Sequence, residues 1–227
     1  MAIKNMNHIV PIIKRDLHIY FRNKSSILIA IIFFLVVTSI LPIGIGPDIK
    51  VLESISPGLL WIAFFLSILL NISIVFENDF KDGSLDLILI ESELPELAII
   101  SKIISFWLIV VLPLVIFLPL GGIILNLPLG NIKQIILMII ISSPFMILIA
   151  SMGSAMALRV SNPSLLITIL IIPFYIPILI FGTLPFIEND IMNFSFSRSL
   201  MLLTSASIFA IVFVPYLLIY VLKVNSD

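Results

Sequence analysis

The residues with the most chemistry in this chain lie in one acidic stretch between two long apolar segments. Residues 77–96 contain seven carboxylates and a single basic residue, Lys81, which gives the stretch a net charge of −6. Apolar residues are interspersed with these charges from Leu85 onward. Such a mixture suits docking to another protein, because charge sets the orientation and rate of encounter. A plain solvated loop explains the same residues equally well.

The sequence lacks the residue patterns that ATP hydrolysis and metal binding usually require. No glycine-rich phosphate loop followed by Lys and Ser or Thr occurs, so we expect no ATP hydrolysis by the chain itself. The two histidines, His8 and His18, precede the first long apolar segment, and there is no cysteine. We therefore predict no catalytic residue, no metal site and no intrinsically bound cofactor.

The segments that position the acidic stretch are built for lipid. Charges divide the sequence into six charge-free runs of 23 to 30 residues, and a helix needs about 20 apolar residues to cross a bilayer. Runs this long and apolar predict helices and not barrel strands. We predict an all-α membrane protein in one domain, 1–227, whose transmembrane helices cover about 27–43, 57–76, 97–125, 134–158, 164–184 and 200–222.

Basic residues are divided unevenly between the two sides that six spans define. Nine of the twelve lie on the side that holds both termini and the acidic stretch. The positive-inside rule then predicts that both termini face the cytoplasm, or a mitochondrial matrix. The span interiors contain no Asp, Glu, Lys or Arg, which argues against an ion-coupled carrier. We expect the lipid bilayer as a partner and no nucleic acid.

Residues 7–22 predict an amphipathic helix that lies in the membrane interface before the first span. Ile9, Ile13 and Leu17 fall on one stripe of such a helix, and basic residues lie largely opposite. The basic residues that we expect at the membrane interface are Lys14, Arg15 and Arg22. A frayed basic tail is the simpler alternative.

A short docking helix is predicted within segment 79–90. Gly83 breaks any helix that continues from the second span, and Ser84 is a good N-cap. Asp86 falls in the first turn, where the helix dipole favours a negative charge. The following apolar residues form about two helical turns across the inner surface, where they can fit a groove on a soluble protein.

Three blocks of sequence resemble, in order and spacing, the haem exporter protein B family of cytochrome c maturation. The blocks are residues 41–47 (LPIGIGP), 55–61 (ISPGLLW) and 76–85 (FENDFKDGSL). Residues 82–89 (DGSLDLIL), followed by Pro95 and Lys102, look like the coupling-helix signature of type-2 ABC exporter permeases. The resemblance implies a permease of this type, with a cytoplasmic coupling helix, in a bacterial inner membrane or a mitochondrial inner membrane.

The resemblance also implies the partners and the site. We expect a separate ATP-binding subunit that holds the ATP, a haem-handling membrane protein and a haem chaperone. Because six spans make half of a usual exporter, we also expect a second copy of the chain. The resemblance assigns coupling to the ATP-binding subunit to Asp79, Asp82, Gly83, Ser84 and Leu85, with their neighbours Lys81, Asp86, Ile88 and Leu89.

Three functions follow from these observations. The first is a permease subunit, not an enzyme by itself, for haem export or delivery in c-type cytochrome biogenesis. The second is a non-transporting assembly subunit that uses the same ATPase to release a haem-loaded chaperone. The third and weakest is an ion-coupled carrier. Whether haem itself crosses, or only a conformational signal, stays open.

Overall fold

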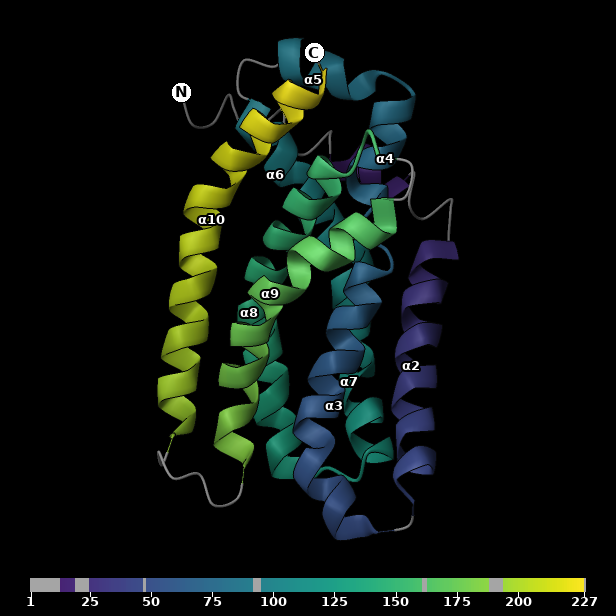
Figure 1. The fold of residues 1–227 in the computed structure, drawn as a ribbon, viewed down its shortest axis with the longest axis vertical. Helices are drawn as coiled ribbons and strands as arrows, with labels where there is room; N and C mark the ends of the chain where they lie inside the picture. The colour runs from purple at the N-terminus through teal and green to yellow at the C-terminus, as the bar shows by residue number, and fades with distance from the viewer. Residues whose placement is uncertain are drawn as a thin grey trace.

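Six helices that are long and apolar enough to cross a membrane run side by side in the described part of the chain (Figure 1). The computed structural model describes residues 13–18, 25–46, 48–91, 95–160, 163–187 and 194–226. The predicted all-α membrane fold with six transmembrane helices is confirmed. Its helices are α2 (Ser25–Ile45), α3 (Ile49–Leu69), α4 (Ile74–Lys81), α5 (Ser84–Glu91), α6 (Pro95–Phe106), the π-helical η1 (Trp107–Val111), α7 (Leu112–Ile124), α8 (Leu129–Met156), α9 (Pro163–Thr183), the 3₁₀ turn η2 (Leu184–Phe186) and α10 (Phe196–Ser226).

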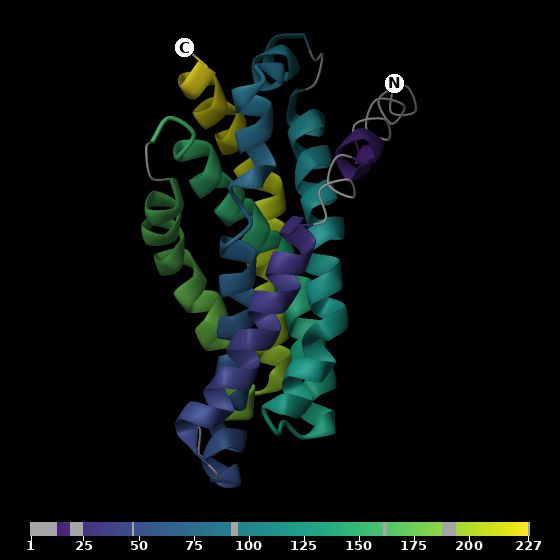
Figure 2. The ribbon, with the colours of Figure 1, turned by 90° about the vertical axis from the view of Figure 1, so that its right-hand side faces the viewer.

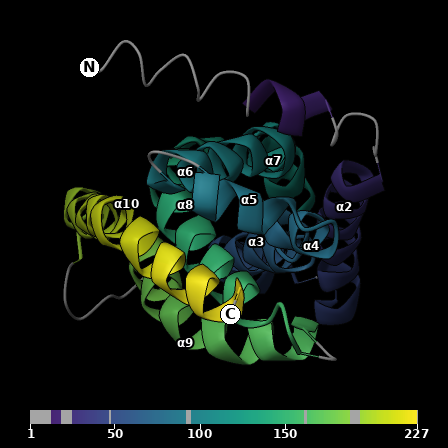
Figure 3. The ribbon, with the colours of Figure 1, turned by 90° about the horizontal axis from the view of Figure 1, so that it is seen from above.

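The α8 helix is the centre of the bundle and packs most extensively against α10 and α9 (Figure 3). Small residues on α8 let its neighbours approach closely, as is usual where helices associate in lipid. A Cβ atom at Gly153 would lie 2.8 Å from the side chain of Ile171 on α9. On the α10 side, the Ser207 hydroxyl donates to the carbonyl of Ile141 at 2.7 Å.

Large apolar side chains cover the outer faces of the peripheral helices. On α2, Ile32 and Ile40 are exposed, and on α10 the rings of Phe209 and Phe213 are exposed and lie 4.6 Å apart. Apolar patches of this extent are uncommon on proteins surrounded by water. The surface therefore matches the hydrocarbon environment that the sequence predicts.

The second span begins earlier than predicted and is broken near its other end. The Asp48 side chain accepts hydrogen bonds from the backbone N–H groups of Lys50 and Val51, which starts α3 at Ile49, ahead of the predicted start of the span at residue 57. Residues 70–73 then interrupt the helix before α4. The Ser154 hydroxyl of α8 donates to the Ser73 carbonyl at 3.5 Å, which gives the interruption a partner from another helix.

The third span contains a π-helical turn. The backbone N–H of Leu112 bonds the carbonyl of Trp107, five residues back, and Pro113 follows directly. Proline has no N–H and its ring crowds the preceding turn, so a wider turn relieves the clash. The indole N–H of Trp107 donates to the Ser143 hydroxyl of α8 at 2.8 Å, which ties the turn to the bundle centre.

Spans two and five pack closely where Gly182 of α9 faces Trp61 of α3. A Cβ atom at this position would lie 2.5 Å from the ring of Trp61, which is fully buried. Rings of this size cannot move aside without disturbing several neighbours. The lack of a side chain at Gly182 is therefore what allows α9 to pack against α3.

We predict that Gly182→Ala destabilises the protein by about 1–3 kcal/mol, because the added methyl group overpacks the contact with Trp61. Gly130→Ala is the matched control, since Gly130 is also helical and a Cβ there meets no atom within 4 Å. Thermal unfolding in detergent measures both variants. Equal unfolding temperatures for the two variants would contradict the prediction.

Candidate coupling site around α5

The α5 helix lies across one end of the bundle, between the end of α4 and the start of α6 (Figure 1, Figure 3). The C-terminal end of α10 and the helical residues 13–18, here called the N-terminal segment, lie at the same end (Figure 2). The connections from α2 to α3 and from α7 to α8 lie at the opposite end (Figure 1). The described residues of the acidic stretch therefore lie at the end of the bundle that holds the N-terminal segment and the end of α10.

The turn between α4 and α5 depends on Gly83, as the sequence predicted. Its φ of +74° lies in the left-handed region that favours glycine. Asp82 ends α4, and its carboxylate accepts the backbone N–H of Ser84 at 2.9 Å. Asp82 therefore caps α5, and the prediction that Ser84 is the N-cap is wrong, since Ser84 is the first residue of the helix.

Charges at the surface of this turn are paired or hydrogen-bonded. Lys81 reaches back one helical turn to the Glu77 carboxylate at 2.5 Å. Hydrogen bonding by Ser84 lowers the pKa of the exposed Asp82 below its usual value, because it stabilises the charged carboxylate. This cap is therefore present above the ordinary aspartate pKa, and it is lost as the pH falls through the lowered pKa.

The two faces of α5 differ in a way that corrects part of the predicted site. Leu85 and Leu89 lie four residues apart on one face, and both are buried in this chain's own core. Their side chains anchor α5 and do not face a partner, contrary to the expectation for Leu85 and Leu89. The opposite face presents Leu87, which is 56% exposed, and Ile90, which is 80% exposed. Asp86 and Ile88 are half-buried between the faces.

Asp79 belongs to a ring of four charges, here called the charge ring, together with Arg15, Asp16 and Lys102. Asp79 pairs with Lys102 and lies 3.5 Å from the Arg15 guanidinium, and Asp16 lies 3.5 Å from Lys102 and 3.0 Å from Arg15. Opposite signs alternate around the ring, so its net charge is zero. The Ser84 hydroxyl donates to Asp79 at 2.9 Å.

The charge ring is largely shielded from solvent. The side chains of Lys102 and Asp16 are each 4% exposed, and that of Asp79 is 14% exposed. Buried charges are costly unless they are paired, so each one here requires its neighbours. Asp79 is therefore engaged within this chain, which corrects the expectation that its carboxylate faces a partner.

The predicted interfacial helix is described only over residues 13–18, which are helical. Lys14 is exposed, and Arg15 is 45% exposed while it bonds the charge ring. Arg22 lies outside the described residues. The N-terminal segment thus packs against α4 and α6 through Arg15 and Asp16, in addition to any contact with lipid.

Sequence reasoning missed Asp16 as a site residue and noted Lys102 only as part of the coupling-helix signature. A signal was present for Lys102, because it shares a helical face with the buried residues Ala98, Ile99 and Phe106. A lone lysine on an apolar face needs a carboxylate from elsewhere. Asp16, which lies beside the apolar stripe of the N-terminal segment, supplies one.

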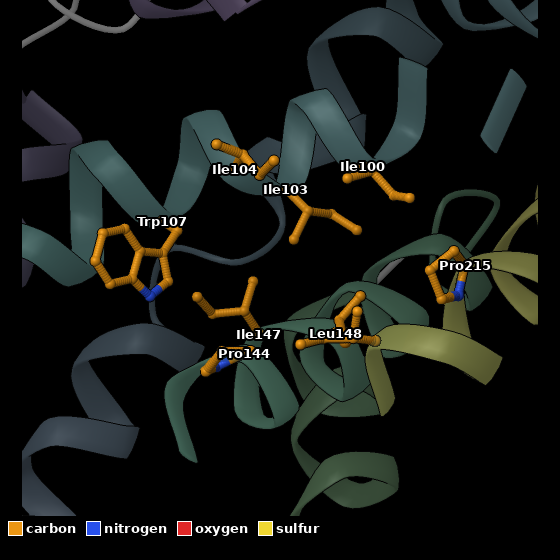
Figure 4. A pocket seen from close by; sticks show the side chains of 9 residues that line it. Ile100, Ile103, Ile104, Trp107, Pro144, Ile147, Leu148 and Pro215 are labelled. Atoms are coloured by element: carbon orange, nitrogen blue, oxygen red, sulfur yellow. The ribbon is translucent and has the colours of Figure 1, made fainter. Parts of the chain in front are cut away.

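An apolar cavity of about 310 Å³ lies between α6, α8 and α10, beneath the π-helical turn (Figure 4). Ile103, Trp107, Ile147 and Pro215 point into it from these helices. The indole N–H of Trp107 already donates to Ser143, so it is not free for a ligand. The residues that line the cavity therefore lack the polar groups that orient a charged substrate.

The fold and the site define an all-α, multi-pass membrane protein of the permease class. The model of the family described as "CcmB protein" matches residues 7–225, and the chain belongs to this family. The resemblance drawn from the three sequence blocks is thereby confirmed.

Relatives of similar length match most of the chain. "Heme exporter protein B" of Haemophilus influenzae is 31% identical over 96% of this chain and 98% of its own length. The protein of the same name from Bradyrhizobium diazoefficiens is 32% identical over 93% of this chain and 95% of its own length. That of Paracoccus denitrificans is 36% identical over 74% of this chain and 77% of its own length. The similarity therefore includes both the spans and the coupling site.

We predict that Gly83→Ala loosens the start of α5, because a residue with a Cβ costs about 1–2 kcal/mol in the left-handed region. Amide hydrogen exchange over residues 84–91 should become faster. Gly44→Ala is the matched control, since a Cβ there also meets open space but the backbone has no positive φ. Unchanged exchange in Gly83→Ala would show that the turn tolerates a side chain.

Proposed function

We propose that this chain is the permease subunit of an ABC-type complex for haem export in c-type cytochrome biogenesis. The observation that carries the proposal is the outward apolar face of α5, formed by Leu87 and Ile90 at the end of the bundle. The names of the relatives support haem as the exported molecule. A separate ATP-binding subunit supplies the energy, and this chain is not itself an enzyme.

The outward face of α5 is the surface that contacts the ATP-binding subunit. Leu87 and Ile90 are three residues apart, so they lie side by side on one helical face. The exposed Lys81 and Asp82 flank this face at the preceding turn. Such an arrangement gives an apolar centre with a charged rim, the usual composition of an interface between proteins.

ATP acts on the permease by linkage. Binding of ATP by the partner shifts the permease only as far as the partner prefers one of its conformations. Leu85 and Leu89 fix α5 to the core, so a displacement of α5 is transmitted into the spans. The interruption at residues 70–73 lets α4 tilt separately from α3.

The complex lies in the inner membrane of a bacterium, with both termini and α5 in the cytoplasm. Support comes from the excess of basic residues on the side of the termini, and from α10 and the N-terminal segment ending near α5. A second copy of the chain, a haem-handling membrane protein and a haem chaperone complete the assembly. A mitochondrial inner membrane is the alternative location.

Release of a haem-loaded chaperone without transport is the second candidate function. The observation that favours it is that His8 and His18, the two histidines of the sequence, precede the first span. The spans thus contain no imidazole for haem iron. In this function, the same coupling site drives a conformational signal to the far side of the membrane.

We predict that Ile90→Ser and Leu87→Ser each weaken binding of the ATP-binding subunit by roughly tenfold or more, as expected for an apolar residue at an interface centre. Ile43→Ser is the matched control. Ile43 is also 80% exposed, but it lies near the C-terminal end of α2, at the end of the bundle opposite α5. Co-purification and ATPase rates in reconstituted vesicles measure the effect. The coupling surface is rejected if the α5 variants and the control behave alike.

The two candidate functions separate in sealed vesicles that carry this chain and its ATP-binding subunit. Export predicts ATP-dependent movement of haem into the lumen. Assembly predicts ATP-dependent release of a haem-loaded chaperone with no movement of haem. Neither activity in vesicles with active ATPase would overturn both functions.

A further inference from the structure

We propose that the charge ring is the joint that fixes α5 and the N-terminal segment against spans two and three. Lys102 and Asp16 are its positioning residues, since they hold Asp79 and Arg15. The inference deepens the proposed function and rests on it, because the position of α5 matters for transport only if α5 receives force.

The geometry assigns this role because the members of the charge ring come from three different segments of the chain. Arg15 and Asp16 belong to the N-terminal segment, Asp79 to α4 and Lys102 to α6. The Ser84 hydroxyl adds the first turn of α5 through its bond to Asp79. One connected set of polar contacts therefore joins the N-terminal segment, α4, α5 and α6.

The ion pairs of the charge ring are directional, unlike the apolar contacts that surround them. Around it, α4, α5 and α6 bury apolar residues such as Phe76, Leu85 and Ile99. Apolar contacts are non-directional, so they set positions only through the shapes of the packed side chains. A buried ion pair instead requires defined positions, because any displacement leaves a charge without a partner. The charge ring thus restricts the end of the bundle to arrangements that keep all four charges paired.

The charge ring makes the N-terminal segment a bridge between α4 and α6. Two of its residues, Arg15 and Asp16, reach both α4 and α6, so the segment bridges the spans on either side of α5. Movement of α5 that separates Asp79 from Lys102 would also release the segment. The segment therefore follows the coupling helix and does not lie independently on the membrane surface.

Neutral variants of two ring members separate a positioning role from a merely structural one. Asp79→Asn and Lys102→Met each leave the buried charge ring with one charge unbalanced, so each should lower the unfolding temperature by at least about 5 °C. The double variant Asp79→Asn/Lys102→Met removes one charge of each sign and leaves the Arg15–Asp16 pair intact. It should regain most of the lost stability but not the links from the N-terminal segment to α4 and α6.

Distances between elements supply the decisive measurement, because the sequence has no native cysteine. Spin labels on His18→Cys and Asn78→Cys, both exposed positions outside the charge ring, report the placement of the N-terminal segment on α4. Measured on the full chain in lipid nanodiscs, the parent should give one narrow distance distribution. Both single variants and the double variant should broaden it, and Lys102→Arg should keep it narrow. Lys133→Met, which removes an exposed lysine at the opposite end of the bundle, should leave it unchanged.

Coupling is then measured in the complete complex as haem delivered per ATP hydrolysed. The double variant should lose roughly tenfold, a size typical of coupling between sites, although its stability has recovered. The proposal is overturned if the double variant recovers distance and coupling together with stability, or if the distance stays narrow in Asp79→Asn. The distance measurement needs no ATP-binding subunit. It therefore tests the charge ring even if the proposed function is wrong.

Discussion

Pairing of buried charges is the constraint on which the end of this bundle depends. Lys102 lies on the buried face of a membrane helix, where an unpaired ammonium group would be strongly unfavourable. Two carboxylates satisfy it, and one of them comes from a segment 86 residues away in the sequence. The need to satisfy Lys102 therefore fixes where the N-terminal segment and α4 lie, and through Ser84 it also fixes the first turn of α5.

The two spans next to α5 contain irregular turns, whereas the central helix α8 is regular. Regular helix and small residues hold the central α8 against its neighbours. The interruption at residues 70–73 and the π-helical turn before Pro113 both fall in the two spans that lead to α5. Local departures from the α-helix lower the cost of bending, and π-helical turns are frequent at functional sites. The two irregular turns thus lie in the spans that precede and follow α5 in the sequence.

The features that sequence predicted are those decided by local properties. Length and apolarity of each charge-free run determine the six helices, and the left-handed backbone at Gly83 explains why a break was readable there. The face that α5 buries was not readable, because Leu85 to Ile90 includes apolar residues on both faces. The charge ring was not readable either, since the two pairs of Lys102 join residues 23 and 86 positions apart, and no periodic pattern relates them.

A coupling helix has two mechanical requirements, and the structure meets them with different residues. The helix must be bound firmly to the permease, which the buried Leu85 and Leu89 achieve through their apolar contacts with the core. It must also keep a defined orientation, which apolar contacts alone do not impose. The bond from Ser84 to Asp79 imposes that orientation, because Asp79 is itself held from two sides. Residues first read as contacts for a partner therefore hold α5 in place, and Leu87 and Ile90 are the side chains that stay exposed on its other face.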